Sequence, residues 1–233
     1  MKSNLEILCV IPARGGSKAI PNKNITMLAG KPLLSYMLNA AQNTKSISRV
    51  VVSTDSPKVG NVAKRYGAEV IDRPDDISGD SAHSELALLH ALHHLERKEG
   101  YSPDLLVFLQ CTAPLTLPED IEGTIEALIR EKADTALLLT PFHHFLWKQD
   151  LEKNNLTGIN HDITPATRTM RQDLDPPFLE TGAVYVIKAH KFKNIGYRFF
   201  GKIAYHLVPS DRVLEIDDPI DLVVAEALIK NRS

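Results

Sequence analysis

The chain has 233 residues, of which 43% are hydrophobic, and a net charge of −2 at pH 7. This length suits one α/β domain with a full core, and we treat residues 1–233 as a single domain. The balanced charge argues against a nucleic-acid partner, and the absence of an apolar run of about 18 residues argues against a membrane span. Two cysteines, Cys9 and Cys111, lie in or beside apolar segments. Unpaired core cysteines favour a reducing, cytoplasmic location.

The first expected strand, residues 5–11, is followed by a basic loop that contains a pair of glycines. Glycine lets the backbone turn tightly and approach a ligand closely. Arg14, Lys18 and Lys23 place three cations in this loop. Exposed N–H groups and positive charge after a strand suit a polyphosphate, although the loop matches neither the Walker A nor the dinucleotide glycine pattern. An ordinary surface loop is the alternative.

Strands and helices alternate through the first 140 or so residues. Continuous apolar runs predict buried parallel strands, and the segments between them have helical periodicity. Such a sheet is doubly wound, mostly parallel and Rossmann-like, and it binds ligands beyond the carboxyl ends of its strands. Arg14, Asp55 and Gln110 each follow a strand, so we expect them to meet at one crevice. The strands are expected at residues 5–11, 49–53, 105–109 and 135–139, and the helices at 32–42, 56–66, 84–98 and 118–131.

The pattern changes at about residues 141–177, which hold paired histidines, Trp147, a polar turn and many Thr, Pro and Arg residues. We interpret this segment as a small, protruding, β-rich insertion. An excursion that meets no partner is the alternative. Beyond it we expect a strand at residues 178–188 and a last helix at 219–230.

Two carboxylates precede that last helix. Glu215 and Asp217 are two residues apart, so on an extended segment they point to the same side. Near a polyphosphate they could hold Mg²⁺, which binds a few carboxylates together with substrate oxygens and water. The alternative is that Asp217 or Asp218 caps the helix, which would begin at Pro219.

Several motifs, in order along the chain, give it a resemblance to a known family. They occupy residues 11–24, 28–33, 53–55, 73–74, 109–114, 181–185 and 215–222. Together they resemble the sugar-activating nucleotidyltransferases. Ser17-Lys18 and Lys23-Asn24 make the first loop most similar to that of the cytidylyltransferases that produce CMP-sialic acids and related CMP-nonulosonates. The resemblance covers about residues 5 to 228.

This resemblance implies a Mg²⁺-dependent enzyme that joins CTP and a nonulosonic acid, a 2-keto-3-deoxy sugar acid, into a CMP-sugar acid and pyrophosphate. It also implies a nucleotidyltransferase fold and a homodimer whose contact lies in the insertion. Two alternatives stay open. One is a CMP-octulosonate (KDO-type) synthetase, against which the form of the first loop argues. The other is a nucleotide-binding homologue without turnover.

The resemblance also assigns site residues. Arg14, Lys23 and Asp217 are expected to act in catalysis, and Asp217 with Glu215 to hold the metal. The family has Asp-x-Asp here, so Glu215 is a departure and Asp217 the firmer ligand. The residues expected to bind the nucleotide are Ala13, Arg14, Gly15, Ser17, Lys18, Lys23, Asn24, Arg73 and Ser84.

For the sugar acid, the resemblance assigns Gln110, Thr112, Lys148 and Arg171, with Arg168 as a substitute for Arg171. A carboxylate suits bidentate arginine, although basic residues in a polar insertion are often only solvated. The family pattern Leu-Gln-Pro-Thr-Ser-Pro-Leu-Arg is replaced here by Leu-Gln-Cys-Thr-Ala-Pro-Leu-Thr at residues 109–116. We expect its cysteine to be a core-edge residue rather than a reactive thiol.

Overall fold

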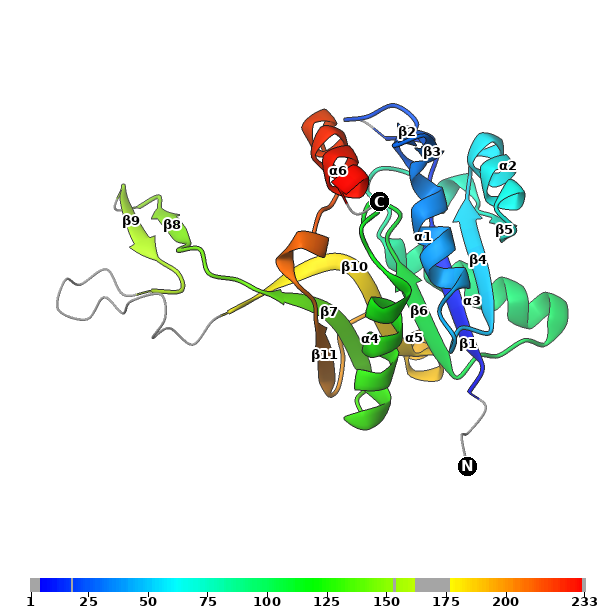
Figure 1. Cartoon of the computed structure of the whole chain (residues 1–233). Coiled ribbons are helices and arrows are strands. Elements are labelled where there is room, and N and C mark those ends of the chain that lie inside the picture. The colour runs from blue at the N-terminus through cyan, green and yellow to red at the C-terminus, as the bar shows by residue number, and fades with distance from the viewer. Residues whose placement is uncertain (1–4, 18, 153, 162–176, 232–233) are drawn as a thin grey trace.

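A computed structural model describes residues 5–17, 19–152, 154–161 and 177–231 (Figure 1). Its centre is a seven-stranded sheet in the order β11-β7-β10-β6-β1-β4-β5. Only β10 runs antiparallel to its neighbours, β6 and β7. The strands of this sheet are β1 (Ile7–Pro12), β4 (Arg49–Thr54), β5 (Glu69–Asp72), β6 (Leu105–Leu109), β7 (Thr135–Pro141), β10 (Phe178–Lys188) and β11 (Ile203–Leu207).

Helices cover both faces of the sheet. Along β1, Ile7, Cys9 and Ile11 face one apolar core and Leu8 and Val10 face the other, because successive side chains of a strand point to opposite sides. The first core packs against α1 (Leu33–Gln42), α2 (Pro57–Arg65), α4 (Pro118–Arg130) and α6 (Pro219–Asn231). The second packs against α3 (Ser84–Glu99) and α5 (Ala189–Ile195). The predicted doubly wound, mostly parallel sheet is confirmed.

Every helix and strand that the sequence predicts is present, with both ends within two residues of the expected positions. In the central sheet and the α-helices that cover it, β5, α5 and β11 were missed. Strand β5 has only four residues, begins and ends with an acid, and lies at an edge of the sheet. Strand β11 is the other edge, and its Ile203, Tyr205 and Leu207 remain largely exposed. Short or half-exposed strands lack the continuous apolar run that marks the central ones.

The segment at 141–177 contains a β-hairpin, formed by β8 (Trp147–Asp150) and β9 (Asn155–Gly158), which pair antiparallel. The hairpin projects well away from the central sheet (Figure 1). β-structure is therefore present where the sequence predicts it, while residues 162–176 lie outside the described part of the chain. A second small pair, β2 (Met27–Leu28) and β3 (Lys31–Pro32), precedes α1. Within the described residues, no helix combines the length and apolar character needed to cross a bilayer.

Candidate active site

A cleft of about 310 Å³ opens where the carboxyl ends of β1, β5 and β6 meet. Asp55, which follows β4 and was expected here, is not among the residues that line it. The loop before α3 and the acidic segment before α6 also line it. The expected crevice is therefore present, and the doubly wound topology explains why distant segments meet there. The predicted site residues that line it are Arg14, Ser17, Lys23, Asn24, Arg73, Ser84, Gln110, Thr112, Glu215 and Asp217.

The basic loop after β1 is fastened from two sides. The Gly15 N–H donates a hydrogen bond to Asp55 Oδ1 at 3.0 Å, just beyond the end of β4. A Cβ at Gly15 would lie 2.7 Å from the Cβ of Ser56, so a larger residue cannot take this place without a backbone shift. Asn24 closes the loop, because its side-chain amide donates to the Arg14 carbonyl at 2.9 Å. These two hydrogen bonds fix the conformation of the loop where it borders the cleft.

Lys23 ties this loop to the acidic segment almost two hundred residues further along. Its ammonium group donates to the Ile216 carbonyl at 2.8 Å and to Asp217 Oδ1 at 3.0 Å. The Ile216 N–H in turn donates to the Thr112 carbonyl, also at 2.8 Å. Lys23 therefore joins the loop after β1 to the segment before α6, and the Ile216 N–H joins that segment to the loop after β6.

Arg73 supplies a buried positive charge to the cleft. It has only 8% of its surface exposed and lies 3.5 Å from Asp55. Burial lowers the pKa of its guanidinium, and the neighbouring carboxylate opposes that shift. Its Nε is buried and has no hydrogen-bond partner among the described residues. A buried unpaired donor is costly, and because Nε has almost no exposed surface, a ligand in the cleft would reach it only after a local shift.

Glu215 lies deeper than Asp217 and is held by Thr112, whose hydroxyl donates to Glu215 Oε1 at 3.1 Å. Burial raises the pKa of Glu215, and the Thr112 hydrogen bond works against that rise. The backbone of Gly182 packs closely on this group. A Cβ there would lie 2.9 Å from Glu215 Oε2 and 3.1 Å from Gln110 Oε1, and φ is +69°. Glycine is the residue that tolerates both constraints.

The helix-capping alternative for Asp217 does not match the hydrogen bonds that the structure shows. Asp221 Oδ2 accepts the N–H groups of Asp217 and Asp218 at 2.9 and 2.7 Å. Asp221 is the third residue of α6, and a carboxylate there that reaches back to the preceding N–H groups is one half of a capping box. The side chain of Asp217 points instead to Lys23, with 67% of its surface exposed.

Some predicted residues lie elsewhere. Ala13 is fully buried below the cleft, and Gly15 faces Asp55 rather than the open space. Lys148 is on β8, in the hairpin that projects away from the sheet (Figure 1), and it is not among the residues that line the cleft. Lys18, Arg168 and Arg171 lie outside the described residues.

Cys111 is a core-edge residue, as expected. It is 3% exposed, and burial raises the pKa of its thiol to about 12, so almost none of it is thiolate at neutral pH. Its Sγ lies 3.9 Å from the Asn24 carbonyl, where it packs the basic loop against the end of β6. Cys9 is also buried and free.

Asp80, Ala82 and Phe108 are among the cleft residues that the sequence did not single out. Asp80 forms an ion pair with Arg14 at 2.8 Å across the cleft. It lies between Arg73 and Ser84, both assigned to the nucleotide, and this spacing is the signal that could have drawn attention to it. Phe108 belongs to the predicted strand 105–109 and looked like an ordinary core residue.

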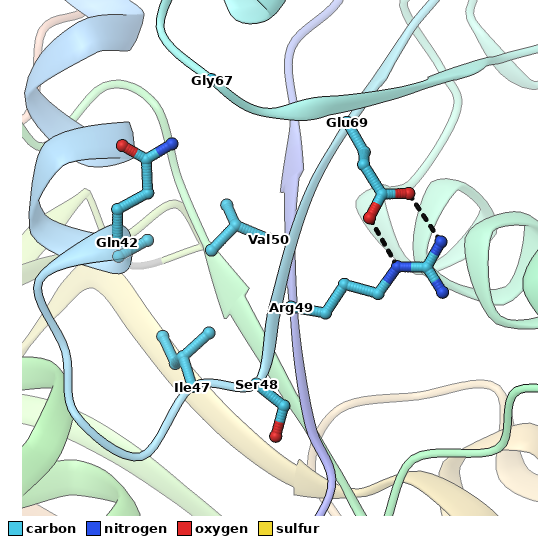
Figure 2. A pocket seen from close by; sticks show the side chains of 8 residues that line it. Gln42, Ile47, Ser48, Arg49, Val50, Gly67 and Glu69 are labelled. Carbon is cyan, nitrogen blue, oxygen red and sulfur yellow. Dashed lines mark hydrogen bonds and ion pairs between the residues drawn. The ribbon is translucent and has the colours of Figure 1, made fainter.

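A second cavity of similar volume, also about 310 Å³, lies at the opposite, amino end of β4 and β5. Gln42, Val50 and Gly67 are among its lining residues (Figure 2). Arg49, the cation at this cavity, already binds Glu69 through two hydrogen bonds, and it binds Glu99 as well. The saturated ion pairs and the position at the amino ends of the strands indicate a structural role.

Comparison with known proteins agrees with this geometry. A family profile described as cytidylyltransferase matches residues 8–197. N-acylneuraminate cytidylyltransferase A of Danio rerio is 31% identical over 97% of this chain and 51% of its own length. Pseudaminic acid cytidylyltransferase of Campylobacter jejuni is 31% identical over 96% of both chains. Among solved structures, CMP:2-keto-3-deoxy-manno-octonic acid synthetase complexed with CTP superposes with a TM-score of 0.72 at 17% identity, covering 98% of this chain and 100% of that one.

The chain belongs to the cytidylyltransferase family. The resemblance seen in the sequence is therefore confirmed. The chain spans about half the length of the N-acylneuraminate cytidylyltransferases that it matches, and nearly the full length of the pseudaminic acid enzyme. The octonic acid synthetase shares the fold at low identity.

Proposed function

We propose that this chain is a Mg²⁺-dependent cytidylyltransferase that joins CTP and a nonulosonic acid into a CMP-sugar acid and releases pyrophosphate. The observation that carries this proposal is the meeting of Arg14 and Lys23, from a glycine-containing loop, with the carboxylates of Glu215 and Asp217 in one cleft. Family membership and the names of the relatives support the substrate class.

In the proposed reaction, the anomeric hydroxyl oxygen of the sugar acid attacks the α-phosphorus of CTP. The bond from that phosphorus to the bridging oxygen of pyrophosphate breaks, and the hydroxyl proton passes to solvent. Such chemistry depends on positioning and on charge stabilisation. Arg14 and Lys23 neutralise the polyphosphate and the departing pyrophosphate. Arg73 and Ser84 bind the nucleotide, and Gln110 and Thr112 face the acceptor.

The two carboxylates fit a magnesium ion. Asp217 is open to the cleft and Glu215 is oriented by Thr112. Among the described residues there is no cluster of three or more metal-binding side chains, which suits Mg²⁺, since this ion takes most of its ligands from substrate and water. When bound, Mg²⁺ supplies positive charge to the phosphate oxygens and lowers the pKa of a coordinated hydroxyl.

The Thr112 hydrogen bond gives a test of this carboxylate site. Glu215 must be ionised to hold a cation, so activity falls as the pH drops through its pKa. In Thr112→Val the hydrogen bond that stabilises the carboxylate is lost, the pKa rises further, and the acid-side loss of activity should begin at a higher pH. Profiles of kcat/KM for CTP against pH at fixed Mg²⁺ measure this. Ser102→Ala, in the exposed loop before the amino end of β6, should keep the wild-type profile, and an unshifted Thr112→Val profile would contradict the assignment.

Pyrophosphate release tests the function itself. The assay contains CTP, Mg²⁺ and, one at a time, N-acetylneuraminate, its deaminated analogue, legionaminate- and pseudaminate-type acids, and the eight-carbon octulosonate. CTP-dependent release with a nonulosonate supports the proposal and names the acceptor. Release with the octulosonate alone favours the KDO-type alternative. CTP binding without release from any acid favours the nucleotide-binding homologue.

We also propose a homodimer and a cytoplasmic location. The dimer is supported by exposed apolar side chains on the hairpin, Trp147, Leu151 and Leu156. Large exposed apolar groups on a projecting element are typical of a protein–protein contact. The family resemblance implies that the insertion reaches toward the partner's active site, which would bring Lys148 to that cleft. Light scattering should give twice the mass of one chain, and a monomeric mass at micromolar concentration would contradict the dimer. The two buried free cysteines support the location.

A further inference from the structure

Each cation in the described part of the cleft already has a carboxylate partner. Arg14 pairs with Asp80 at 2.8 Å, Lys23 with Asp217 at 3.0 Å, and Arg73 with Asp55 at 3.5 Å. A polyphosphate that binds these cations must compete with the carboxylates or share the cations with them. The three acids differ in their roles in the cleft and in how exposed their side chains are.

Asp55 and Asp217 have other tasks. Asp55 accepts the Gly15 N–H and so anchors the basic loop, and Asp217 is part of the proposed cation site. Asp80 comes from the surface loop between the short 3-10 helix Asp75–Ile77 and α3. Its side chain is 48% exposed, and that of Arg14 is 35% exposed. Exposed ion pairs contribute little to stability, so this pair can exchange partners at low cost.

We propose that Asp80 is a counter-ion that competes with pyrophosphate for Arg14 and thereby promotes product release. This inference rests on the proposed function. When phosphate oxygens bind the Arg14 guanidinium, the negatively charged Asp80 carboxylate lies beside the negatively charged phosphate and repels it. When pyrophosphate leaves, the ion pair with Asp80 forms again and satisfies the guanidinium.

The competition acts mainly on the product. CTP has its base and ribose to hold it, with Arg73 and Ser84 on either side of the Asp80 loop as candidate contacts. Free pyrophosphate has only the cations. If the repulsion by Asp80 lowers the binding free energy of both ligands equally, CTP stays bound through its base and ribose, while pyrophosphate dissociates. Since the charges are near the surface, the repulsion should shrink as ionic strength rises.

Calorimetric titration of the full chain with magnesium pyrophosphate tests the inference without any sugar acid. Asp80→Asn should bind pyrophosphate about fivefold more tightly than wild type at low salt, because one like charge a few ångströms away is removed. Asp80→Glu, which keeps the charge, should stay close to wild type. Asp76→Asn removes the same charge from a nearby position of the same surface region and should also leave the affinity unchanged.

Unchanged or weaker pyrophosphate binding by Asp80→Asn would overturn the inference. Equal tightening by Asp76→Asn would do so as well, because it would indicate a general charge effect. Titration of wild type with CTP separates this result from failure of the proposed function. Wild type that binds CTP and pyrophosphate, with no response to Asp80→Asn, refutes the role of Asp80 alone. Wild type that binds neither ligand refutes both proposals.

Discussion

Lys23→Ala should lower kcat/KM for CTP by about two to three orders of magnitude, the range seen when one preorganised charge or donor is removed from a transition state. The variant loses the cation that faces the polyphosphate. It also loses the hydrogen bonds to Ile216 and Asp217 that tie the basic loop to the acidic segment. Loss of charge stabilisation lowers turnover, and loss of the tether misplaces the carboxylates that flank it.

Steady-state kinetics at saturating CTP and acceptor separate these effects from weak binding. Lys31→Ala removes an exposed lysine eight residues further along and serves as the matched control. Lys23→Arg keeps the charge and should recover part of the activity. Near-normal turnover of Lys23→Ala at saturating CTP would remove Lys23 from the catalytic machinery.

The sequence predicted the central sheet because its strands are continuous apolar runs and the intervening helices have clear periodicity. It could not give the direction of β10, which lies antiparallel between β6 and β7. A fully buried strand has the same composition in either direction. The edge strands β5 and β11 were not predicted, because only part of each strand is buried and neither forms a continuous apolar run.

The cleft was predictable wherever a residue follows a strand or belongs to a motif, as Arg14, Gln110 and Asp217 do. The ion-pair partners of those residues could not be predicted, because ion pairs across a cleft depend on the paths that the loops take. Asp80 and Arg14 are far apart in sequence, and although the residues that flank Asp80 are assigned to the nucleotide, the local pattern does not predict that it pairs with Arg14. Lys148 shows the converse limit: the resemblance assigns it an acceptor contact, yet it lies on β8 of the projecting hairpin and does not line the cleft of its own chain.

Asp217→Asn should lower kcat/KM by about three orders of magnitude, because the charge that a metal ion supplies to phosphate oxygens is worth several kcal/mol and each 1.36 kcal/mol is about tenfold in rate. Asparagine has nearly the same shape and keeps an oxygen to accept from Lys23, so the tether between the loops can survive. Its neutral oxygen is a much poorer ligand for Mg²⁺. Part of the activity should therefore return at high Mg²⁺ concentration.

The adjacent Asp218 provides the control, since Asp218→Asn removes the same charge one residue away. The backbone N–H of Asp218 donates to Asp221 in the helix cap, and this hydrogen bond is kept in the variant because only the side chain changes. Binding of Mn²⁺ in the presence of CTP, followed by electron paramagnetic resonance, should weaken in Asp217→Asn and not in Asp218→Asn. Equal losses in the two variants would mean that the acidic segment acts only through its overall charge. Selective loss at Asp217 would instead identify the carboxylate beside Lys23 as a metal ligand, where the positive charges of the cleft and of the ion converge on one polyphosphate.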